Sequence, residues 1–563
     1  MYSNKENINI LTRLLIDFGV KKAVVCPGSR NAPILHNLYS NGAIKCFSVT
    51  DERSAGFCAL GMSLSSGEPI VVCVTSGSAV LNLAPAVAEA YYQNVPLIVL
   101  SADRPAQWIG QSDGQTIAQS HILEPHVRQS VHLKEPHTAE ESWYCNRLVN
   151  EALLACSRNA SAPVHINVEI SEPLFDYTIE TLPTQRLIRW HATDENIFLM
   201  EEIAKSFATA SKPMIVIGQM AMATYEGLRS SVEQLENYAV VLREKLSDTA
   251  TAPAQCFDEV IASLENNETY APDFLLYVGG TIVSKRLKNF LRIAKPCRSV
   301  LVDEWGDVRD TFMTLTDLIQ TTPKNALQVL AQQITNKAAT NFAALWREKL
   351  KKAQRHALDF IPEYSQMMVV KRFHALYLNA GKNSFLVYGN SSALRLGNIY
   401  ATNHLLVNRG VNGIEGTLST AVGYSIDKQN AGKVYCVLGD LSFFYDQNAL
   451  WNQRLGSNLV IVLLNNGGGG IFKQLPGFEQ SPSCDEYVCA NHQTTAKGVC
   501  EQHHIAYFAA HNAHELEAGL QQLFVDRNTS VLLEVFTNAT IDAEMIKTYY
   551  QSFKQKSIDK KIT

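Results

Sequence analysis

The chain has 563 residues, a formal net charge of −5, and 46% hydrophobic against 18% charged residues. At about 100–200 residues per domain, this length predicts roughly three or four domains of ordinary globular composition. The acidic balance and the lack of a basic tract argue against nucleic acid or an anionic membrane surface as a partner, whereas anionic small substrates stay open because local arginines matter more than total charge.

The first residues, 1–7, lead into an amphipathic stretch, and no apolar run approaches the roughly 18 residues of a membrane-spanning helix. We therefore expect a cytoplasmic protein without membrane insertion. The 12 cysteines are scattered singly, with no Cys-x-x-Cys pair. This pattern indicates buried, reduced thiols rather than a disulfide framework or a structural zinc site.

Apolar runs typical of strands recur through the first third of the chain. They cover residues 20–25, 44–49, 69–74, 96–100 and 163–170, and segments of helical length lie between most of them. This alternation predicts a doubly wound α/β domain with a largely parallel sheet, over residues 1–182. Residues 181–195 contain turn residues but no apolar period, which indicates a linker.

A second α/β unit follows, which we place at residues 195–345. Its apolar runs cover residues 212–218, 274–280 and 298–303. The turn after the first run lacks the Gly-x-Gly-x-x-Gly spacing that a dinucleotide pyrophosphate needs, so this Rossmann-like unit need not bind a nucleotide. Residues 336–372 are charged and helical in pattern, with Trp346, Leu350 and Leu358 expected on the apolar side.

The last third of the chain, placed at residues 368–563, repeats the rhythm of the first. Its strand-like runs cover residues 385–388, 404–407, 433–438, 458–464 and 531–536. Two α/β domains of similar cadence that flank a smaller one suggest an internal duplication, although no repeat is visible at the level of residues.

Two polar clusters follow neighbouring strands in this last third. Gly439-Asp440-Leu441-Ser442 follows one, and Asn465-Asn466 with the glycines 467–470 follows the next. Open α/β sheets bind ligands at the carboxyl ends of their strands, and carboxylate, amide and backbone oxygens suit Mg²⁺ shared with a phosphate. For either cluster alone, a strand end followed by an ordinary turn is the simpler explanation; together they favour a metal and phosphate site.

Strand ends in the first third carry further candidates. Arg30, with Ser29 beside it, is suited to bind an acidic substrate group, and the alternative is a tight turn with a solvated arginine. Glu52 follows the second strand and precedes small and apolar residues, which would shield a carboxylate that shuttles a proton. The alternative is a surface glutamate that suits a helix dipole.

One arginine in each of several loops would create a cationic pocket in an acidic protein, or these arginines are unrelated surface residues. They are Arg30, Arg104, Arg286, Arg395 and Arg409. Four histidines, His121, His126, His132 and His137, fit neither one helical face nor a zinc pattern, and we expect ordinary loop residues.

With these motifs in place, the chain resembles thiamine diphosphate enzymes of the pyruvate-oxidase-like architecture, and among them the 2-succinyl-5-enolpyruvyl-6-hydroxy-3-cyclohexene-1-carboxylate synthase family of menaquinone biosynthesis. The likeness covers essentially the whole chain and is most specific at residues 27–33, 51–53, 75–77, 102–105, 408–416 and 439–442. It implies three doubly wound, Rossmann-like α/β domains: pyrimidine-binding, central and diphosphate-binding.

The resemblance also implies a cofactor site for thiamine diphosphate with Mg²⁺, for which Mn²⁺ would substitute. Glu52 matches the catalytic glutamate on the aminopyrimidine, and Ile414 the apolar residue that bends the cofactor. Asp440, Asn466 and the carbonyl of Gly468 match the metal ligands. The remaining cofactor contacts map to Thr75, Gly389, Ser391, Gly439, Leu441, Ser442, Gly469 and Ile471.

The implied reaction is decarboxylation of 2-oxoglutarate followed by 1,4-addition of the succinyl carbanion equivalent to isochorismate, which makes the enzyme a transferase. Both substrates are polyanions, which would explain the arginines. Family substrate contacts map to Ser29, Arg30, Arg104, Gln115, Lys285, Arg286, Ser391, Arg395, Arg409, Ile471, Phe472 and Leu475. Family sites lie between subunits, so we expect a homodimer or a dimer of dimers.

Two departures from the family pattern affect the substrate details. Residues 112–115 read Ser-Asp-Gly-Gln where Gly-Ala-Asn-Gln is common, so only Gln115 carries over, and Glu415 replaces a frequent aspartate. Another carboligase of this architecture, such as an acetolactate synthase relative, and a catalytically silent thiamine-binding protein remain the alternatives. The arginines disfavour the first, and Glu52 with both metal half-sites disfavours the second.

Overall fold

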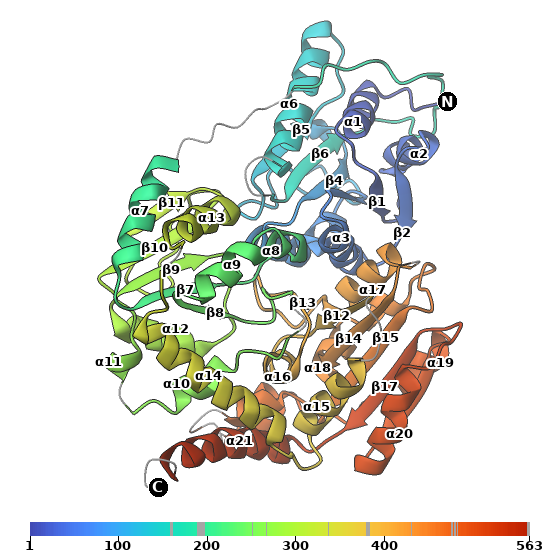
Figure 1. The fold of residues 1–563 in the computed structure, drawn as a ribbon. Coiled ribbons are helices and arrows are strands. Elements are labelled where there is room, and N and C mark those ends of the chain that lie inside the picture. Colours follow the sequence, from blue (N-terminus) through green and yellow to red (C-terminus); the bar gives the residue numbers. More distant parts are fainter. Residues whose placement is uncertain are drawn as a thin grey trace.

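The computed structural model describes residues 1–157, 161–188, 197–249, 252–265, 267–335, 337–378, 383–429, 431–474, 477, 480 and 482–559. Within them, the chain forms three parallel sheets in succession, each with helices packed against it (Figure 1). The fold is therefore α/β throughout, as the alternating pattern of apolar runs predicts. The exact domain boundaries remain predictions.

The N-terminal sheet has the strand order β2-β1-β3-β4-β6-β5. Strands β3 and β4 are buried on both faces, which is typical of the centre of a parallel sheet covered by helices. The strands are β1 (Lys22–Val25), β2 (Lys45–Ser48), β3 (Ile70–Val74), β4 (Leu97–Asp103), β5 (Gln129–Leu133) and β6 (Val164–Glu169), and the helices are α1 (Glu6–Asp17), α2 (Ala32–Ser40), α3 (Glu52–Ser66), α4 (Ala79–Asn82), α5 (Ala84–Gln93), the short 3-10 helix η1 (Ala106–Trp108) and α6 (Ala139–Ser157).

The central sheet is smaller, with the order β11-β10-β9-β7-β8. Its strands are β7 (Pro213–Ile217), β8 (Val240–Arg243), β9 (Phe274–Val278), β10 (Arg298–Asp303) and β11 (Asp317–Gln320). Its helices are α7 (Ile197–Thr209), α8 (Met222–Glu226), α9 (Arg229–Glu236), α10 (Phe257–Ala262), α11 (Asn267–Tyr270), α12 (Lys285–Ala294) and α13 (Pro323–Gln333), and α14 (Asn341–Asp359) leads toward the last part of the chain.

The C-terminal sheet has the order β13-β12-β14-β15-β17-β16, which is the order of the N-terminal sheet repeated. Its strands are β12 (Ser384–Tyr388), β13 (Leu405–Val407), β14 (Lys433–Gly439), β15 (Leu459–Asn465), β16 (Ala506–Ala510) and β17 (Val531–Phe536). The helical segments are α15 (Gln366–Tyr377), α16 (Ser392–Tyr400), α17 (Thr417–Asp427), α18 (Asp440–Tyr445), η2 (Gln447–Leu450), η3 (Gly470–Gln474), η5 (Cys484–Val488), α19 (Lys497–Gln502), α20 (Ala513–Leu523) and α21 (Ala539–Asp559).

Helices α3 and α17 join the N-terminal and C-terminal domains at a close crossing (Figure 1). A Cβ atom added to Gly61 would lie 2.1 Å from the carbonyl oxygen of Thr420, and one added to Gly423 would lie 2.1 Å from that of Cys58. Glycine is required at both positions because backbone, not a flexible side chain, occupies the space.

Two expectations about local structure are wrong. Leu358 is 63% exposed, whereas Trp346 on the same helix α14 is fully buried. Twelve residues at 100° each turn Leu358 about 120° away from Trp346, outside one apolar stripe. His132 is not a loop residue either: it lies on β5, where its ring contacts Glu169 at 2.6 Å and Asn167 at 2.9 Å.

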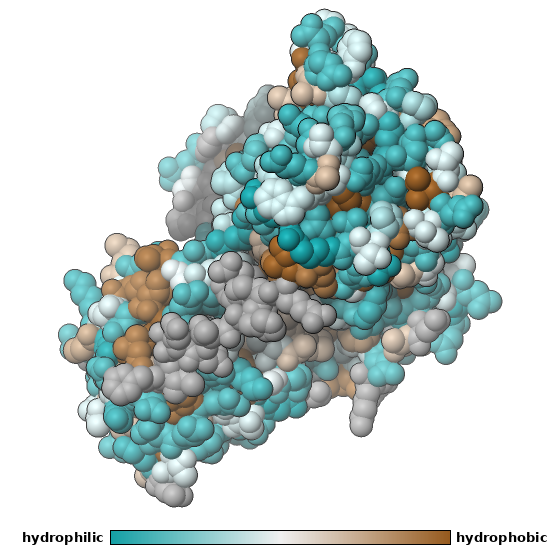
Figure 2. All heavy atoms as spheres, turned by 90° about the horizontal axis from the view of Figure 1, so that it is seen from above, coloured by the Kyte–Doolittle hydropathy of each residue, from teal (hydrophilic) through white to brown (hydrophobic). Residues whose placement is uncertain are grey.

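Other features of the chain agree with the sequence pattern. The cysteines are free, and all except Cys46 and Cys297 are buried. Residues 181–188 form neither helix nor strand, and the rest of the expected linker up to residue 195 lies outside the described residues. In the described part of the chain, none of the helices combines the length and apolar character needed to cross a membrane. The face seen from above is largely hydrophilic, with small separate apolar patches (Figure 2).

Candidate active site

The two polar clusters of the C-terminal domain meet at the carboxyl ends of β14 and β15. These strands are adjacent and parallel, with Gly439 opposite Leu464. One carboxylate oxygen of Asp440, Oδ2, accepts hydrogen bonds from the backbone N–H groups of Asn466 (3.1 Å), Gly467 (2.8 Å) and Gly468 (3.0 Å). Asp440 therefore organises the glycine loop that follows the next strand, and the expected pairing of the two clusters is confirmed in space.

The amide of Asn466 has a defined orientation. Its Nδ2 donates to Oδ2 of Asp542 at 2.9 Å, on the first turn of α21. Thr537 Oγ1 donates to the same carboxylate oxygen at 2.8 Å. Because Nδ2 faces Asp542, the carbonyl oxygen of the amide points away from Asp542.

The glycine loop takes a path that other residues would not follow. Gly468 has a φ of +153°, and a Cβ atom there would lie 2.7 Å from the carbonyl oxygen of Cys489. The backbone N–H of Gly469 donates to that same oxygen at 2.6 Å. The loop is thus held against residues 489–492 in a backbone conformation that brings main-chain groups to the strand ends.

The donor set fits a hard divalent cation with a diphosphate. Asp440 offers a carboxylate, Asn466 an amide oxygen and Gly468 a carbonyl, which are oxygen ligands of the kind Mg²⁺ prefers. Burial raises the pKa of Asp440, while hydrogen bonds from backbone N–H groups and the nearby His492 oppose that shift. A bound cation would further favour the ionised carboxylate. The ring Nε2 of His492 lies 3.4 Å from Asp440 Oδ2, a contact that the sequence did not suggest.

Glu52 lies at the first position of α3, in the N-terminal domain. The helix is capped by Asp51, whose side chain accepts from the N–H of Ser54 at 2.9 Å. The Glu52 side chain is half-buried and accepts from Asn82 Nδ2 at 3.1 Å.

Thr75 directly follows β3 and is buried. A Cβ atom added to Gly28 would lie 2.4 Å from the Cβ of Thr75. The loops that follow β1 and β3 are therefore in direct contact.

Arg30 and Arg104 form a cationic corner in this same domain. Arg30 is 5% exposed, and its Nη1 donates to the carbonyl of Ile170 at 2.9 Å. Burial lowers the pKa of Arg30, and the charge of Arg104 lowers it further. Arg104 pairs with Asp113 at 3.0 Å. Arg30 pairs in turn with Glu172 at 3.3 Å, so both guanidinium groups have a carboxylate partner, and both have the donor geometry to bind an anionic ligand.

Gln115 and Ser29 lie at the edge of this corner. Gln115 has a φ of +55°. Its backbone packs closely against Gly77, because a Cβ atom added to Gly77 would lie 3.2 Å from it. Gly77 in turn donates its N–H to Gln119 Oε1 at 2.6 Å. Ser29 is exposed. The structure thus brings the candidates of separate strand-end loops together, although they are spread from Ser29 to Gln115 in the sequence.

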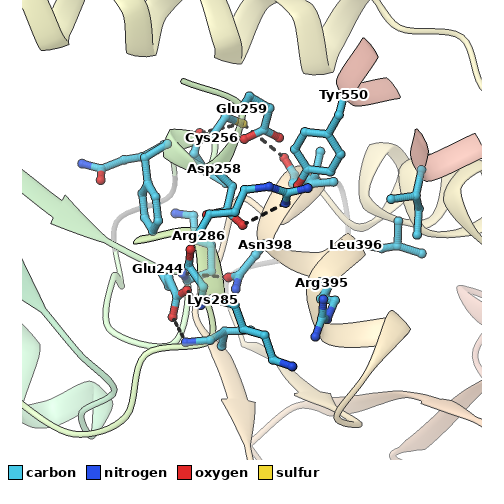
Figure 3. Close-up of a pocket in the computed structure, with 18 of the residues that line it drawn as sticks. Glu244, Cys256, Asp258, Glu259, Lys285, Arg286, Arg395, Leu396, Asn398 and Tyr550 are labelled. Atoms are coloured by element: carbon cyan, nitrogen blue, oxygen red, sulfur yellow. Dashed lines mark hydrogen bonds and ion pairs between the residues drawn. The ribbon is translucent and has the colours of Figure 1, made fainter. Parts of the chain in front are cut away.

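A cavity of about 530 Å³ opens between the central domain, the C-terminal domain and α21 (Figure 3). Its walls include six of the predicted substrate-binding residues: Lys285, Arg286, Ser391, Arg395, Ile471 and Phe472. Ser391 has a φ of +66°, a conformation that non-glycine residues rarely adopt outside functional sites. Leu475, also expected here, lies outside the described residues.

Arg286 is held by two residues that the sequence did not suggest. Its guanidinium carbon lies 4.0 Å from the centre of the Tyr550 ring, and its Nη1 lies 3.7 Å from Asp258 Oδ2 (Figure 3). Tyr550 comes from α21 and Asp258 from α10. Neither stands near a motif, so only the packing of three elements reveals them.

Arg409 does not line this cavity, but it is close enough to Glu244 and Arg395 in the cavity walls for their charges to act on it. Its Nη1 donates to Asn390 Oδ1 at 3.1 Å, whereas its Nε is buried without a hydrogen-bond partner among the described residues. Burial lowers the pKa of Arg409, and the charge of Arg395 adds to this. Burial and Arg409 likewise lower the pKa of Lys288, a residue of α12 that sequence reasoning missed. Such crowded cations are stabilised by a bound anion.

The remaining cofactor candidates lie around the same strand ends. Gly389 follows β12 and donates its N–H to Val437, and Leu441 donates its N–H to Asp440 Oδ1 at 2.7 Å. Ser442 is buried on α18, whereas Ile414 is 38% exposed.

Comparison with known proteins places these residues in a wider group. The thiamine pyrophosphate enzyme N-terminal TPP binding domain matches residues 8–122, and the C-terminal TPP binding domain matches residues 389–535. The 2-succinyl-5-enolpyruvyl-6-hydroxy-3-cyclohexene-1-carboxylate synthase of Phocaeicola vulgatus is 43% identical over 99% of this chain and 100% of its own length. Proteins of the same name from Bacteroides thetaiotaomicron (41%, covering 99% and 100%) and Porphyromonas gingivalis (34%, covering 98% and 97%) are also similar.

Proposed function

The chain belongs to the 2-succinyl-5-enolpyruvyl-6-hydroxy-3-cyclohexene-1-carboxylate synthase family, and we propose that it decarboxylates 2-oxoglutarate and adds the succinyl unit to isochorismate in menaquinone biosynthesis. It is a thiamine diphosphate-dependent enzyme. The observation that carries the proposal is a cavity whose walls bring Lys285, Arg286 and Arg395 together with Ile471 and Phe472, which directly follow the glycine loop, because both substrates are polyanions.

When bound, thiamine diphosphate would supply a carbon nucleophile for the 2-oxo group and an electron sink for the loss of CO₂. Asp440, Asn466 and Gly468 would hold Mg²⁺, or Mn²⁺ in its place, against the diphosphate. Asp440 is well suited to this task because three backbone N–H groups fix its carboxylate before any ligand arrives. Preorganisation of this kind removes the cost of ordering the loop on binding.

Glu52 would exchange a proton with the pyrimidine ring nitrogen of the cofactor, and Ile414 would support the cofactor's bend. A carboxylate at the start of α3 can both accept and return a proton, whereas an amide cannot. Asn82 donates to the Glu52 carboxylate and holds it in place. The cationic corner of Arg30 and Arg104 would bind a substrate carboxylate on this side of the site.

We propose that two copies of the chain form each site. The neighbours of Glu52 contact the segment that follows Asp440 in the same chain: Arg53 donates to the carbonyl of Tyr445, the last residue of α18, at 2.8 Å, and Asp51 accepts from Asn448 of η2 at 2.9 Å. On this proposal, Glu52 serves the metal half-site of a second copy, as the resemblance to enzymes with sites between subunits implies. Exposed apolar side chains near these contacts support the proposal: Leu81 (46%) adjoins Asn82, which donates to Glu52, and Tyr445 (52%) contacts Arg53.

Each of the three domains has its own part in the proposed site. We propose a pyrimidine-binding domain at residues 1–182, a central domain at 195–345 that contributes Lys285 and Arg286, and a diphosphate-binding domain at 368–563. We also propose a cytoplasmic location and assembly as a homodimer or a dimer of dimers, since the reaction needs no membrane and the half-sites need a partner.

The test is isochorismate-dependent product formation from 2-oxoglutarate with thiamine diphosphate and Mg²⁺. Replacing Glu52 by Gln keeps the volume and removes the proton acceptor, so we expect turnover to fall by about 100-fold or more without loss of folding. Arg395→Ala should raise KM for the substrates. If Arg395→Ala and Arg409→Ala leave activity on both substrates nearly unchanged, an acetolactate synthase-like carboligase is favoured; no CO₂ release with cofactor bound would contradict catalysis altogether.

A further inference from the structure

We propose that Asp542 is a positioning residue that orients the Asn466 amide, so that its oxygen rather than its nitrogen faces the metal ion. The inference rests on the proposed function, because it takes Asn466 as a metal ligand. It concerns a residue on the C-terminal helix α21, 76 positions beyond Asn466 in sequence.

An asparagine side chain alone does not determine which end faces a cation. Its amide oxygen and nitrogen are nearly equal in size, and a half-turn of the amide exchanges them. With the nitrogen turned inward, the site would lose one oxygen ligand and present two N–H donors to a positive ion. A metal-binding asparagine therefore needs a neighbour that accepts from its nitrogen.

Asp542 meets this requirement. Its Oδ2 accepts from Asn466 Nδ2 at 2.9 Å, and an ionised carboxylate can only accept hydrogen bonds. The opposite amide orientation would place two oxygen acceptors face to face. Gly470 makes room for the contact, since a Cβ atom there would lie 2.5 Å from Asn466 Nδ2.

The orienting carboxylate is itself held firmly. Asp542 is 8% exposed, its Oδ1 accepts from the backbone N–H of Gln366 at 2.8 Å, and its Oδ2 also accepts from Thr537 Oγ1 at 2.8 Å. The Gln366 donor belongs to the main chain and cannot be reversed. These neighbours all donate to the carboxylate, so Asp542 acts toward Asn466 as an acceptor in a fixed place.

The placement follows from the strand order. Strand β17 lies beside β15, with Phe536 opposite Asn465, so α21 begins at the same sheet edge as the glycine loop. Eight residues further along the same helix, Tyr550 stacks on Arg286 in the substrate cavity. One helix therefore bears both a group that orients a metal ligand and a group that holds a substrate-binding arginine.

The variant Asp542→Asn provides a sharp test. The fixed Gln366 donor should retain the oxygen of the new amide, which turns the nitrogen of that amide toward Asn466. Asn466 then accepts from it and directs its own nitrogen at the metal ion. We expect Mn²⁺ and thiamine diphosphate to bind the purified apo-protein about 10–100-fold more weakly, measured by Mn²⁺ electron paramagnetic resonance and by calorimetry.

The exchanged pair Asn466→Asp/Asp542→Asn separates orientation from mere structural support. Here the amide at position 542 donates to a carboxylate at position 466, whose second oxygen faces the metal ion whichever way it turns. Total charge is unchanged. We expect this double variant to recover most of the affinity that Asp542→Asn loses, which a simple packing defect at α21 would not allow.

Two further variants complete the experiment. Thr537→Val removes another donor to Asp542 but leaves the Asp542 carboxylate as the acceptor for Asn466. It should change Mn²⁺ affinity by less than Asp542→Asn does.

Asp440→Asn tests the proposed metal site itself: if it leaves Mn²⁺ binding unchanged, the proposed metal site is wrong. If Asp440→Asn abolishes binding while Asp542→Asn binds like the wild type, or if the exchanged pair binds no better than Asp542→Asn, the orienting role of Asp542 is overturned. Thermal unfolding of each apo-protein checks that the variants are folded.

Discussion

The N-terminal and C-terminal sheets have the same strand order, yet their carboxyl edges carry different chemistry. Strand β3 with Thr75 corresponds to β14 with Asp440, and β2 with Glu52 corresponds to β13 with Arg409. We propose that the C-terminal edge supplies oxygen ligands for a metal ion, whereas the N-terminal edge supplies the proton acceptor Glu52; arginines lie at both edges. The same topology thus supplies two complementary halves, because the loops and not the sheet order determine what an edge binds.

The two edges also differ in how far one chain completes them. Asp440 is 3% exposed and bound by its own loop, whereas the carboxylate of Glu52 is half-buried beside exposed apolar side chains. A half-site that is already closed can bind a diphosphate by itself. A half-site that is open toward solvent needs a partner to exclude water from the proton transfer. This difference supports the proposal that a second copy of the chain completes the site.

The largest effect is expected when the two half-sites, Glu52 and Asp440, are inactivated in different copies of the chain. Glu52→Gln and Asp440→Asn should each lower activity by about 100-fold or more. After co-refolding or co-expression in equal amounts, mixed dimers contain one site with both changes and one intact site, so about a quarter of wild-type activity should return. Activity is measured first, on the unfractionated mixture. The two variants carry different affinity tags, and purification through both tags in succession then verifies that mixed dimers are present. No recovery in verified mixed dimers would contradict a site shared between chains.

A second prediction concerns the crossing where the equivalent helices α3 and α17 meet. Gly423→Ala should lower stability by about 1–3 kcal/mol, because the new Cβ would overlap the carbonyl of Cys58. Urea unfolding measures the change. Gly498→Ala, on helix α19 with nothing within 4 Å of the added Cβ, is the matched control and should be neutral or stabilising. Equal stability of the two variants would show that the crossing is not tightly packed.

The smallest effect is expected at helix α21, which follows the C-terminal sheet and has no counterpart among the described residues after the N-terminal sheet. Helix α21 comes after β17, whereas residues 170–188 after β6 contain no helix. Tyr550→Leu removes the ring from Arg286 and should raise KM for the anionic substrate by about 2–30-fold, with kcat less affected. Tyr550→Phe keeps the ring and should behave like the wild type. Similar KM values for the Leu and wild-type proteins would contradict a role of the ring in holding Arg286.

Much of the fold followed from apolar runs in the sequence, and the failures share one physical reason. The strands that no run predicts, β5, β8, β11 and β16, all lie at the ends of their sheets. An edge strand has one neighbour and a partly exposed face, so it needs no continuous apolar run; β11 and β16 are mostly half-buried or exposed. Strands that are covered on both faces, such as β3 and β15, were recognised because burial demands apolar residues.

The candidate site divides in the same way. Asp440, Asn466 and Glu52 stand in short motifs directly after strands, so the sequence alone identifies them. Asp258, Tyr550 and Asp542 belong to no motif, and each acts through a contact with a residue at least 28 positions away. Such partners are set by the packing of elements that lie far apart in the sequence, which local pattern does not encode.

The alternation of strands and helices, the candidate oxygen ligands at two strand ends and the family all follow from the sequence, because they depend on residue types at short spacing. Only the tertiary structure decided that the two outer sheets share one strand order, that α3 and α17 cross at glycines, and that α21 reaches both the metal loop and the substrate cavity. The physical reason is that a side chain's chemistry is local, whereas its orientation depends on neighbours that folding brings from distant parts of the chain.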